Sequence, residues 1–263
     1  MNSSTVSPAQ KNAASRQELQ PGDSKPRGPK RMGWPARIVR RIRRMYTSRA
    51  LHPNDWFLRK STGVIHVGAN IGQERTLYAR FNLEVIWVEP IPASYAKLQA
   101  NLAGFPKQRG YQYLLTDREG QEYELLLSGE DYMCSSILPY GKIGEANPEE
   151  RYEVVGSLRI TSSTLSAMVK KERIDMAKFQ TLIIDTQGSE LHVLRGALEL
   201  LPHIFFIKVE VADYEGYQGC CTVKDMNEFM NAHGYIERDR VAHAVTVPSV
   251  GRYYDIVYVK EGH

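Results

Sequence analysis

A glycine turn followed by a strand that ends in an acidic residue is the part of this sequence best suited to chemistry. Residues 64–72 read Val-Ile-His-Val-Gly-Ala-Asn-Ile-Gly, an apolar strand that runs into a turn. Gly68 lets the backbone bend sharply there and lets a ligand approach it closely. A second apolar strand, residues 85–88, ends at Glu89, which lies 21 residues after Gly68. An acidic residue at this spacing meets the ribose hydroxyls of bound nucleosides, so the pattern predicts an adenosine site rather than a plain turn with a surface glutamate.

The turn itself indicates which adenosine ligand would fit. Asn70 occupies the place of the middle glycine in a dinucleotide-binding turn. Asparagine tolerates left-handed backbone geometry, but its side chain would crowd the position of a pyrophosphate. Gly72 allows close packing where a helix over residues 71–81 is expected to begin, with free N–H groups facing an electron-rich ligand. A ligand without phosphates is therefore favoured, and a nicotinamide-dependent oxidoreductase is the alternative that the same turn leaves open.

The segments around this turn alternate between predicted strands and predicted helices. This alternation predicts an α/β fold with a doubly wound, mostly parallel sheet and a terminal antiparallel pair over residues 240–247 and 253–260. Strands over 111–115 and 122–127 are expected to form a hairpin, and residues 128–150 a long loop of the kind that covers substrates. Ligands of such sheets bind beyond the carboxyl ends of the strands. The residues expected at that edge are 68–72, Glu89, Asp117, Asp185 and Asp213.

Charge is distributed unevenly along the 263 residues. Residues 1–50 contain 12 Lys/Arg and 2 Asp/Glu, a net charge of +10, whereas residues 51–263 contain 22 and 28, a net charge of −6. The composition predicts a disordered basic arm over 1–50, with a short amphipathic helix at about 34–46, and one folded domain over 51–263. The helix would either pack on the domain or contact an anionic membrane surface. Because the domain is acidic, nucleic acid is an unfavourable partner.

The cysteines and the hydropathy pattern limit the compartment. The chain has an odd number of cysteines, and two of them are adjacent: Cys134, Cys220 and Cys221. This pattern does not suit a disulfide framework. No group of Cys and His residues has the spacing of a zinc site, so no metal is predicted. No apolar run is long enough to span a bilayer, and the N-terminus lacks the apolar core of a signal peptide. A cytoplasmic protein is expected, with the basic arm placing it at the inner face of the membrane.

Several stretches resemble FkbM-type S-adenosylmethionine-dependent methyltransferases. The matching stretches are 66–72, 88–90, Ser135-Ser136, 184–191, 194–197 and 214–216. The resemblance implies a class I Rossmann-like methyltransferase fold, S-adenosyl-L-methionine as cofactor, and methylation of a hydroxyl oxygen on a sugar, glycolipid or other glycoconjugate, lipid-linked acceptors included. The cofactor-binding residues expected from the turn, the acidic strand end and this resemblance are His66, Gly68, Ala69, Asn70, Gly72, Glu89 and Asp117. Asp117 has a plain alternative as a turn residue.

Methyl transfer to a hydroxyl identifies the remaining candidates. The reaction is an in-line displacement, and a base that accepts the hydroxyl proton as the new bond forms would accelerate it. Asp185 follows a buried strand and is the first candidate for that base or for orienting the acceptor, and Glu210 is the second. Besides the oxidoreductase, a non-enzymatic Rossmann-like module docked by its basic arm remains as an alternative.

Overall fold

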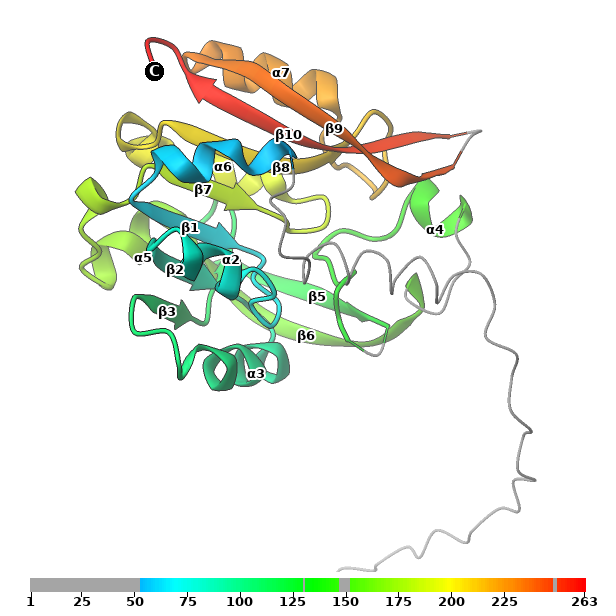
Figure 1. Cartoon of the computed structure of the whole chain (residues 1–263). Helices are drawn as coiled ribbons and strands as arrows, with labels where there is room; N and C mark the ends of the chain where they lie inside the picture. The colour runs from blue at the N-terminus through cyan, green and yellow to red at the C-terminus, as the bar shows by residue number, and fades with distance from the viewer. Residues whose placement is uncertain (1–52, 130, 147–151, 248–249) are drawn as a thin grey trace, which may run out of the picture.

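A computed structural model describes residues 53–263 except 130, 147–151 and 248–249 (Figure 1). The predicted arm over 1–50 and its helix at 34–46 lie outside the described residues. The central sheet has seven strands in the order β3-β2-β1-β7-β8-β10-β9. These strands are β1 (Gly63–Val67), β2 (Glu84–Val88), β3 (Gln108–Tyr111), β7 (Thr181–Ile184), β8 (Phe206–Ala212), β9 (Tyr235–Val247) and β10 (Gly251–Lys260). The first five in this order are parallel, and β10 and β9 are antiparallel, which confirms the predicted α/β sheet and its terminal pair.

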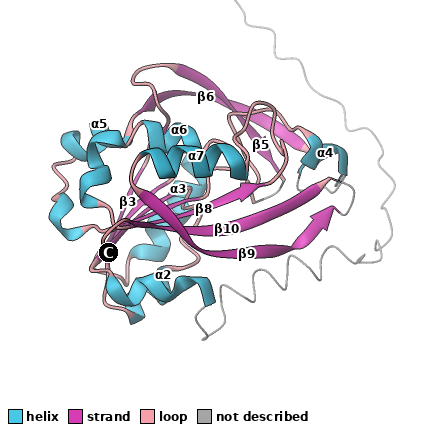
Figure 2. Ribbon diagram, turned by 90° about the horizontal axis from the view of Figure 1, so that it is seen from above, coloured by secondary structure: helices cyan, strands magenta, loops and turns pink. Residues whose placement is uncertain are grey.

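Helices cover both faces of the sheet (Figures 1 and 2). They are α2 (Arg75–Arg80), α3 (Pro92–Leu102), α4 (Lys142–Ala146), α5 (Leu165–Lys171), α6 (Glu190–Arg195) and α7 (Val223–Ala232), with 3-10 helices η1 (Pro53–Lys60), η3 (Met176–Lys178) and η4 (Leu198–His203). Alternate strand residues enter two separate hydrophobic clusters. Leu182 and Ile184 pack on the side of α5, α6 and α7, whereas Ile183 packs on the side of η1, α2 and α3. Continuous apolar strands are what two covered faces require.

The register brings the chemical residues to one edge. Val67 at the end of β1 pairs with Val88 and with Ile184, and Ile184 pairs with Val209. The next residue along each strand is therefore Gly68, Glu89, Asp185 or Glu210. The convergence expected at the carboxyl ends of the strands is thus present for Gly68, Glu89 and Asp185, and Glu210 joins them without having been expected there.

The turn differs from the prediction at its helix. The helix expected over 71–81 begins only at Arg75, because Asn70 and Gly72 have φ values of 45° and 70°, which no right-handed helix accommodates. Gly72 packs against α3 instead, where an added Cβ would lie 2.7 Å from Leu98 Cδ1. The close packing expected of Gly72 is present, but against a different element.

The predicted hairpin over 111–115 and 122–127 is wrong. The strands β4 (Leu114–Leu115), β6 (Val154–Ser163) and β5 (Glu122–Ser128) form a separate small sheet in the order β4-β6-β5, so β6 lies between the two expected partners. Figure 2 shows β5 and β6 side by side. β6 pairs parallel with β4 and antiparallel with β5. A strand of ten residues satisfies more backbone groups of β5 than the two-residue β4 does. β5 therefore pairs with the distant β6 and not with the nearby residues 111–115.

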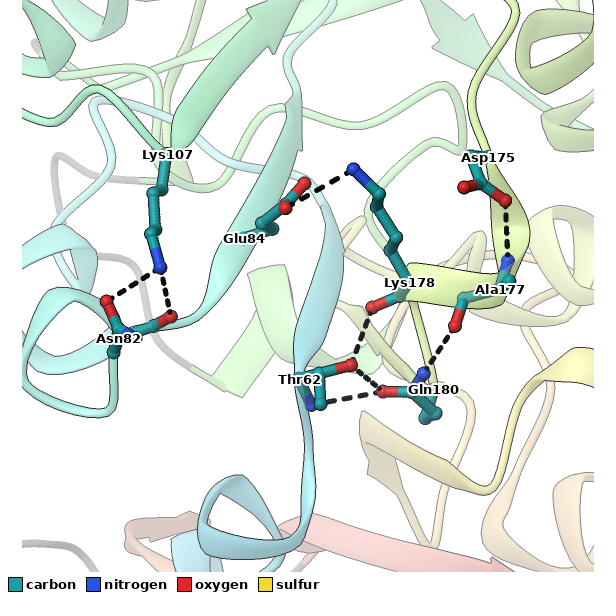
Figure 3. Close-up of polar contacts among 8 residues, drawn as sticks. All are labelled: Thr62, Asn82, Glu84, Lys107, Asp175, Ala177, Lys178 and Gln180. Carbon is teal, nitrogen blue, oxygen red and sulfur yellow. Dashed lines mark hydrogen bonds and ion pairs between the residues drawn. The ribbon is translucent and has the colours of Figure 1, made fainter.

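The amino ends of the parallel strands are tied by exposed polar contacts (Figure 3). Thr62 before β1 bonds both Lys178 O (3.0 Å) and Gln180 Oε1 (2.6 Å) before β7. Lys178 also pairs with Glu84 at 3.5 Å. Such exposed pairs contribute little individually, about 0–1 kcal/mol. Among the described residues, no helix is long and apolar enough to cross a membrane.

Candidate active site

An open cavity lies at the carboxyl ends of β1, β2 and β7. Its polar wall includes Gly68, Asn70, Glu89 and Asp185. Its apolar wall comes from the small sheet and the following loop, with Leu114, Leu115, Leu125 and Ile137. An apolar wall opposite a few polar groups is the usual composition of sites for small organic ligands.

Glu89 is fixed by two backbone donors. Asn70 N donates to Oε2 at 2.8 Å and Ile91 N donates to Oε1 at 2.9 Å. The residue is only 4% exposed, and this burial raises the pKa of its carboxyl to about 7 even though both hydrogen bonds oppose the rise. The predicted adenosine-binding acid is therefore held rigidly at the cavity wall.

The glycine turn is built by close approach of two strand ends. Gly68 has a φ of 84°, and a Cβ placed on it would lie 1.7 Å from the carbonyl oxygen of Asp185. The N–H groups of Gly68 and Ala69 both donate to Val88 O at 3.0 Å, so they hold β2 instead of facing a ligand. Ala69 is buried, whereas Asn70 lines the cavity and its Nδ2 donates to Asp131 O at 3.1 Å. The turn acts mainly by shaping the backbone.

Asp185 lies in a hydrogen-bonded chain that the sequence did not identify. Gln187 Nε2 donates to Asp185 Oδ1 at 2.6 Å, and Tyr217 Oη donates to Gln187 Oε1 at 2.7 Å. Ser136 Oγ donates to the carbonyl oxygen of Gln187 at 2.7 Å, which helps hold that residue at a left-handed φ of 56°. Burial is the largest cause of the raised pKa of Asp185. An oriented carboxylate of raised pKa is a competent proton acceptor.

Glu190 anchors the turn between β7 and α6. Its Oε1 accepts hydrogen bonds from Thr186 N and Gly188 N, each at 3.0 Å. The residue is 2% exposed, and burial raises the pKa of its carboxyl to about 7. It therefore supports Asp185 through the backbone of the turn.

Glu210 lies beside the cavity rather than in its wall. It lines a narrow neighbouring cleft together with Gln187 and Tyr253. Its Oε1 is 3.6 Å from Nδ1 of His243 on β9. Burial raises the pKa of its carboxyl to about 8, and the nearby His243 opposes the rise. Gln187 connects the surroundings of the two candidate bases, Asp185 and Glu210.

Four of the residues expected to bind the cofactor are not in the cavity wall: Ala69 and Gly72 of the turn, and also His66 and Asp117. His66 is 6% exposed, stacks on Trp87 with ring centroids 4.9 Å apart, and has Nδ1 3.0 Å from Tyr78 Oη. Burial lowers the pKa of His66 to about 3, so the imidazole is neutral. Asp117 follows the cavity-lining Leu115 but does not line the cavity itself. His66 packs in the core, and Asp117 keeps only its plain place in the turn.

Asp213, also expected at this edge, holds β10. Its Oδ1 accepts a hydrogen bond from Arg252 N at 2.8 Å, and its Oδ2 accepts one from Tyr254 Oη at 3.1 Å. Its role in the described structure is to join β8 to the neighbouring strand.

The chain is similar to known methyltransferases in sequence and in fold. Residues 66–237 match the model of the methyltransferase FkbM domain. The chain is 24% identical over 175 residues to the 2-O-methyltransferase NoeI of Sinorhizobium fredii, covering 59% of this chain and 65% of that relative. Magnesium protoporphyrin IX methyltransferase (ChlM) of Synechocystis PCC 6803, solved with bound SAH, has a TM-score of 0.48 at 9% identity, covering 89% of this chain and 90% of that one. The structure of the same enzyme with bound SAM has a TM-score of 0.45 at 10% identity, covering 89% and 87%.

The matched segment runs from the glycine turn, through the strand ends that carry Glu89 and Asp185, to the start of β9, and it includes more than half of the chain. The chain therefore belongs to the FkbM family of S-adenosylmethionine-dependent methyltransferases.

Proposed function

We propose that this protein transfers the methyl group of S-adenosylmethionine to a hydroxyl oxygen of a sugar, glycolipid or other glycoconjugate. The observation that carries the proposal is the half-buried Asp185, which lies in the cavity wall next to the Gly68 turn and is oriented by Gln187. A hydroxyl acceptor needs a proton acceptor at this place, whereas an amine that is already neutral does not. The similarity to a relative named as a 2-O-methyltransferase supports oxygen as the acceptor atom.

The residues around the cavity fit the proposed cofactor. The ionised Glu89 carboxylate would accept hydrogen bonds from ribose hydroxyls, and both of its oxygens are already oriented by backbone donors. Leu114, Leu115 and Leu125 offer an apolar surface for a flat base. When bound, the sulfonium supplies an electrophilic methyl group and leaves as a neutral thioether.

The protein contributes alignment and proton transfer to this reaction. Asp185 accepts the proton of the acceptor hydroxyl as the new oxygen–carbon bond forms and the carbon–sulfur bond breaks. Gln187 and Tyr217 keep the carboxylate in one orientation, which reduces the reorganisation needed in the transition state.

The decisive experiment combines binding with methyl transfer. Calorimetry with S-adenosylhomocysteine on the full chain is expected to show binding, and NADH serves as the control for the oxidoreductase alternative. Labelled S-adenosylmethionine is then offered with free sugars, glycolipids and hydroxyl-free amines of similar size. Label on a sugar hydroxyl supports the proposal. Label only on the amines, or binding of NADH in place of S-adenosylhomocysteine, overturns it.

Cofactor affinity is expected to fall as the pH is lowered through the pKa of Glu89. That pKa is about 7 in the free protein, and only the ionised carboxylate accepts both ribose hydroxyls. Below about pH 7 binding must therefore release a proton, so the Kd for S-adenosylhomocysteine increases toward tenfold per pH unit. Calorimetry between about pH 6 and about pH 8 measures this slope. Glu89→Gln should bind more weakly and without this slope, and an equally steep slope in that variant would contradict the assignment.

We also propose a place of action for the protein, in the cytoplasm at the inner face of the membrane. The support is the net charge of +10 on residues 1–50, with a basic amphipathic pattern over 34–46. The full chain should sediment with vesicles that contain anionic lipid and not with neutral vesicles, whereas a chain lacking residues 1–50 should sediment with neither. Equal sedimentation of both chains would disprove the role of the arm.

A further inference from the structure

A histidine and two carboxylates meet where β8, β10 and β9 lie side by side (Figure 2). Glu210 of β8 is opposite Asp255 of β10 in the register. His243 of β9 lies with Nε2 3.3 Å from Asp255 Oδ1 and Nδ1 3.6 Å from Glu210 Oε1. One potential donor atom from each residue lies within 4.8 Å of the other two. Potential donor atoms from three strands are thus close together, with the two carboxylates facing different nitrogens of the imidazole.

The donor on β10 is held in place by its neighbours. Lys208 Nζ lies 3.5 Å from Asp255 Oδ2 and 3.0 Å from Asp55 Oδ1, so Oδ1 of Asp255 remains directed toward His243. Asn54 Nδ2 donates to the Asp255 carbonyl oxygen at 3.0 Å. Asn54 is fully buried, and its Oδ1 has no hydrogen-bond partner among the described residues. Outer groups that orient a carboxylate in this way are typical of metal sites.

The donor set and its exposure indicate the kind of ligand. One imidazole nitrogen with two carboxylate oxygens suits Mn²⁺, Co²⁺ or Zn²⁺ better than Mg²⁺ or Ca²⁺, which prefer oxygen alone. The side chains of His243, Glu210 and Asp255 are 25%, 21% and 14% exposed, so an ion can reach them from solvent. Lys208 is shared between Asp55 and Asp255, so its single positive charge offsets only part of the negative charge of these two carboxylates.

We infer that Glu210, His243 and Asp255 form a binding site for a divalent transition-metal ion beside the methyl-transfer cavity. The inference does not require the proposed acceptor, because it concerns the affinity of the protein for the ion. The same three side chains have a second possible arrangement without metal, in which a protonated His243 bridges the two carboxylates. The two arrangements differ in whether the protein binds an added ion.

A titration of the tag-free full chain with Co²⁺, followed by its visible absorption, tests the inference. We expect saturable binding of one ion, and calorimetry with Mn²⁺ should give the same stoichiometry. Glu210→Gln and His243→Asn each remove one ligand and should weaken binding at least tenfold. Asp55→Asn, which changes only an outer partner, should weaken it by about 10–100-fold. Glu228→Gln, on the exposed surface of α7, is the control and should bind like the unchanged protein.

Two results of these titrations would overturn the inference. Absence of saturable Co²⁺ binding by the unchanged chain means that the imidazolium bridge is the real arrangement. Binding that persists unaltered in both Glu210→Gln and His243→Asn means that the ion sits elsewhere. If His243→Asn does not fold, Glu210→Gln and Asp55→Asn decide the question. Binding of S-adenosylhomocysteine is measured on the same samples, so failure of the metal site and failure of the proposed function are recognised separately.

Discussion

Asp185→Asn should lower kcat by about 10²–10⁴-fold, the usual contribution of a general base. Asparagine keeps the size of the side chain and can still bond Gln187, but its amide cannot accept the hydroxyl proton of the acceptor. Because Glu89 and the glycine turn are untouched, the affinity for S-adenosylhomocysteine should remain within about twofold of the original. Steady-state methyl transfer, with cofactor affinity measured by calorimetry on the same preparation, separates these two effects.

The matched control lies at the opposite edge of the sheet. Asp175 is exposed, caps η3 by accepting a hydrogen bond from Ala177 N at 3.2 Å, and is drawn in Figure 3. Asparagine caps helices as well as aspartate does, so Asp175→Asn should keep full kcat. If Asp185→Asn also kept full kcat, Asp185 would not be the base. Glu210→Gln would then test the second candidate, provided that the metal content of both proteins is matched.

Gly68→Ala should abolish cofactor binding and destabilise the fold by about 2–5 kcal/mol. About 1–2 kcal/mol of this comes from placing a side chain at a left-handed φ, and about 1–3 kcal/mol from overpacking. The overpacking is certain because the new Cβ would lie 1.7 Å from the carbonyl oxygen of Asp185, a backbone atom that cannot turn aside. The ends of β1 and β7 would have to separate, which moves both Glu89 and Asp185 away from a common ligand. Urea unfolding and calorimetry measure the two losses.

Gly120→Ala separates the two contributions. Gly120 also has a left-handed φ, 74°, but no atom lies within 4 Å of a Cβ placed there. It should lose only about 1–2 kcal/mol and bind S-adenosylhomocysteine normally. Equal effects of the two substitutions would mean that backbone strain, rather than the close approach of two strands, explains the need for Gly68.

The parts of the site that were predictable from sequence are those that depend on local order along the chain. Gly68, Glu89 and Asp185 each follow an apolar strand directly, and parallel strands bring their carboxyl ends to one edge whatever the loops do.

The parts that were not predictable depend on contacts between distant segments. β6 lies between β4 and β5 and pairs with both of them. The residues around the turn at Asp117 carry no sign of this distant strand, so they predict a hairpin. Tyr217 reaches Gln187 across 30 residues, and nothing in its sequence neighbourhood indicates that bond. His66 carries a titratable ring next to the turn, but the stack on Trp87 that buries it follows from the sheet register. Residue type alone cannot distinguish a ligand-facing histidine from a core one.

The strand order also has a consequence for the timing of synthesis. β9 precedes β10 in the chain, yet it reaches the sheet only through β10, which pairs with β8 on one side and β9 on the other. A nascent chain that has emerged only as far as β9 therefore lacks the native partner of β9, and His243 has no Asp255 to contact. The five parallel strands can assemble earlier, because β1, β2, β3, β7 and β8 all precede β9 and β10 in the chain. Ribosome-bound intermediates should hence acquire the cofactor cavity before residue 255 emerges, and the cluster of Glu210, His243 and Asp255 only afterwards.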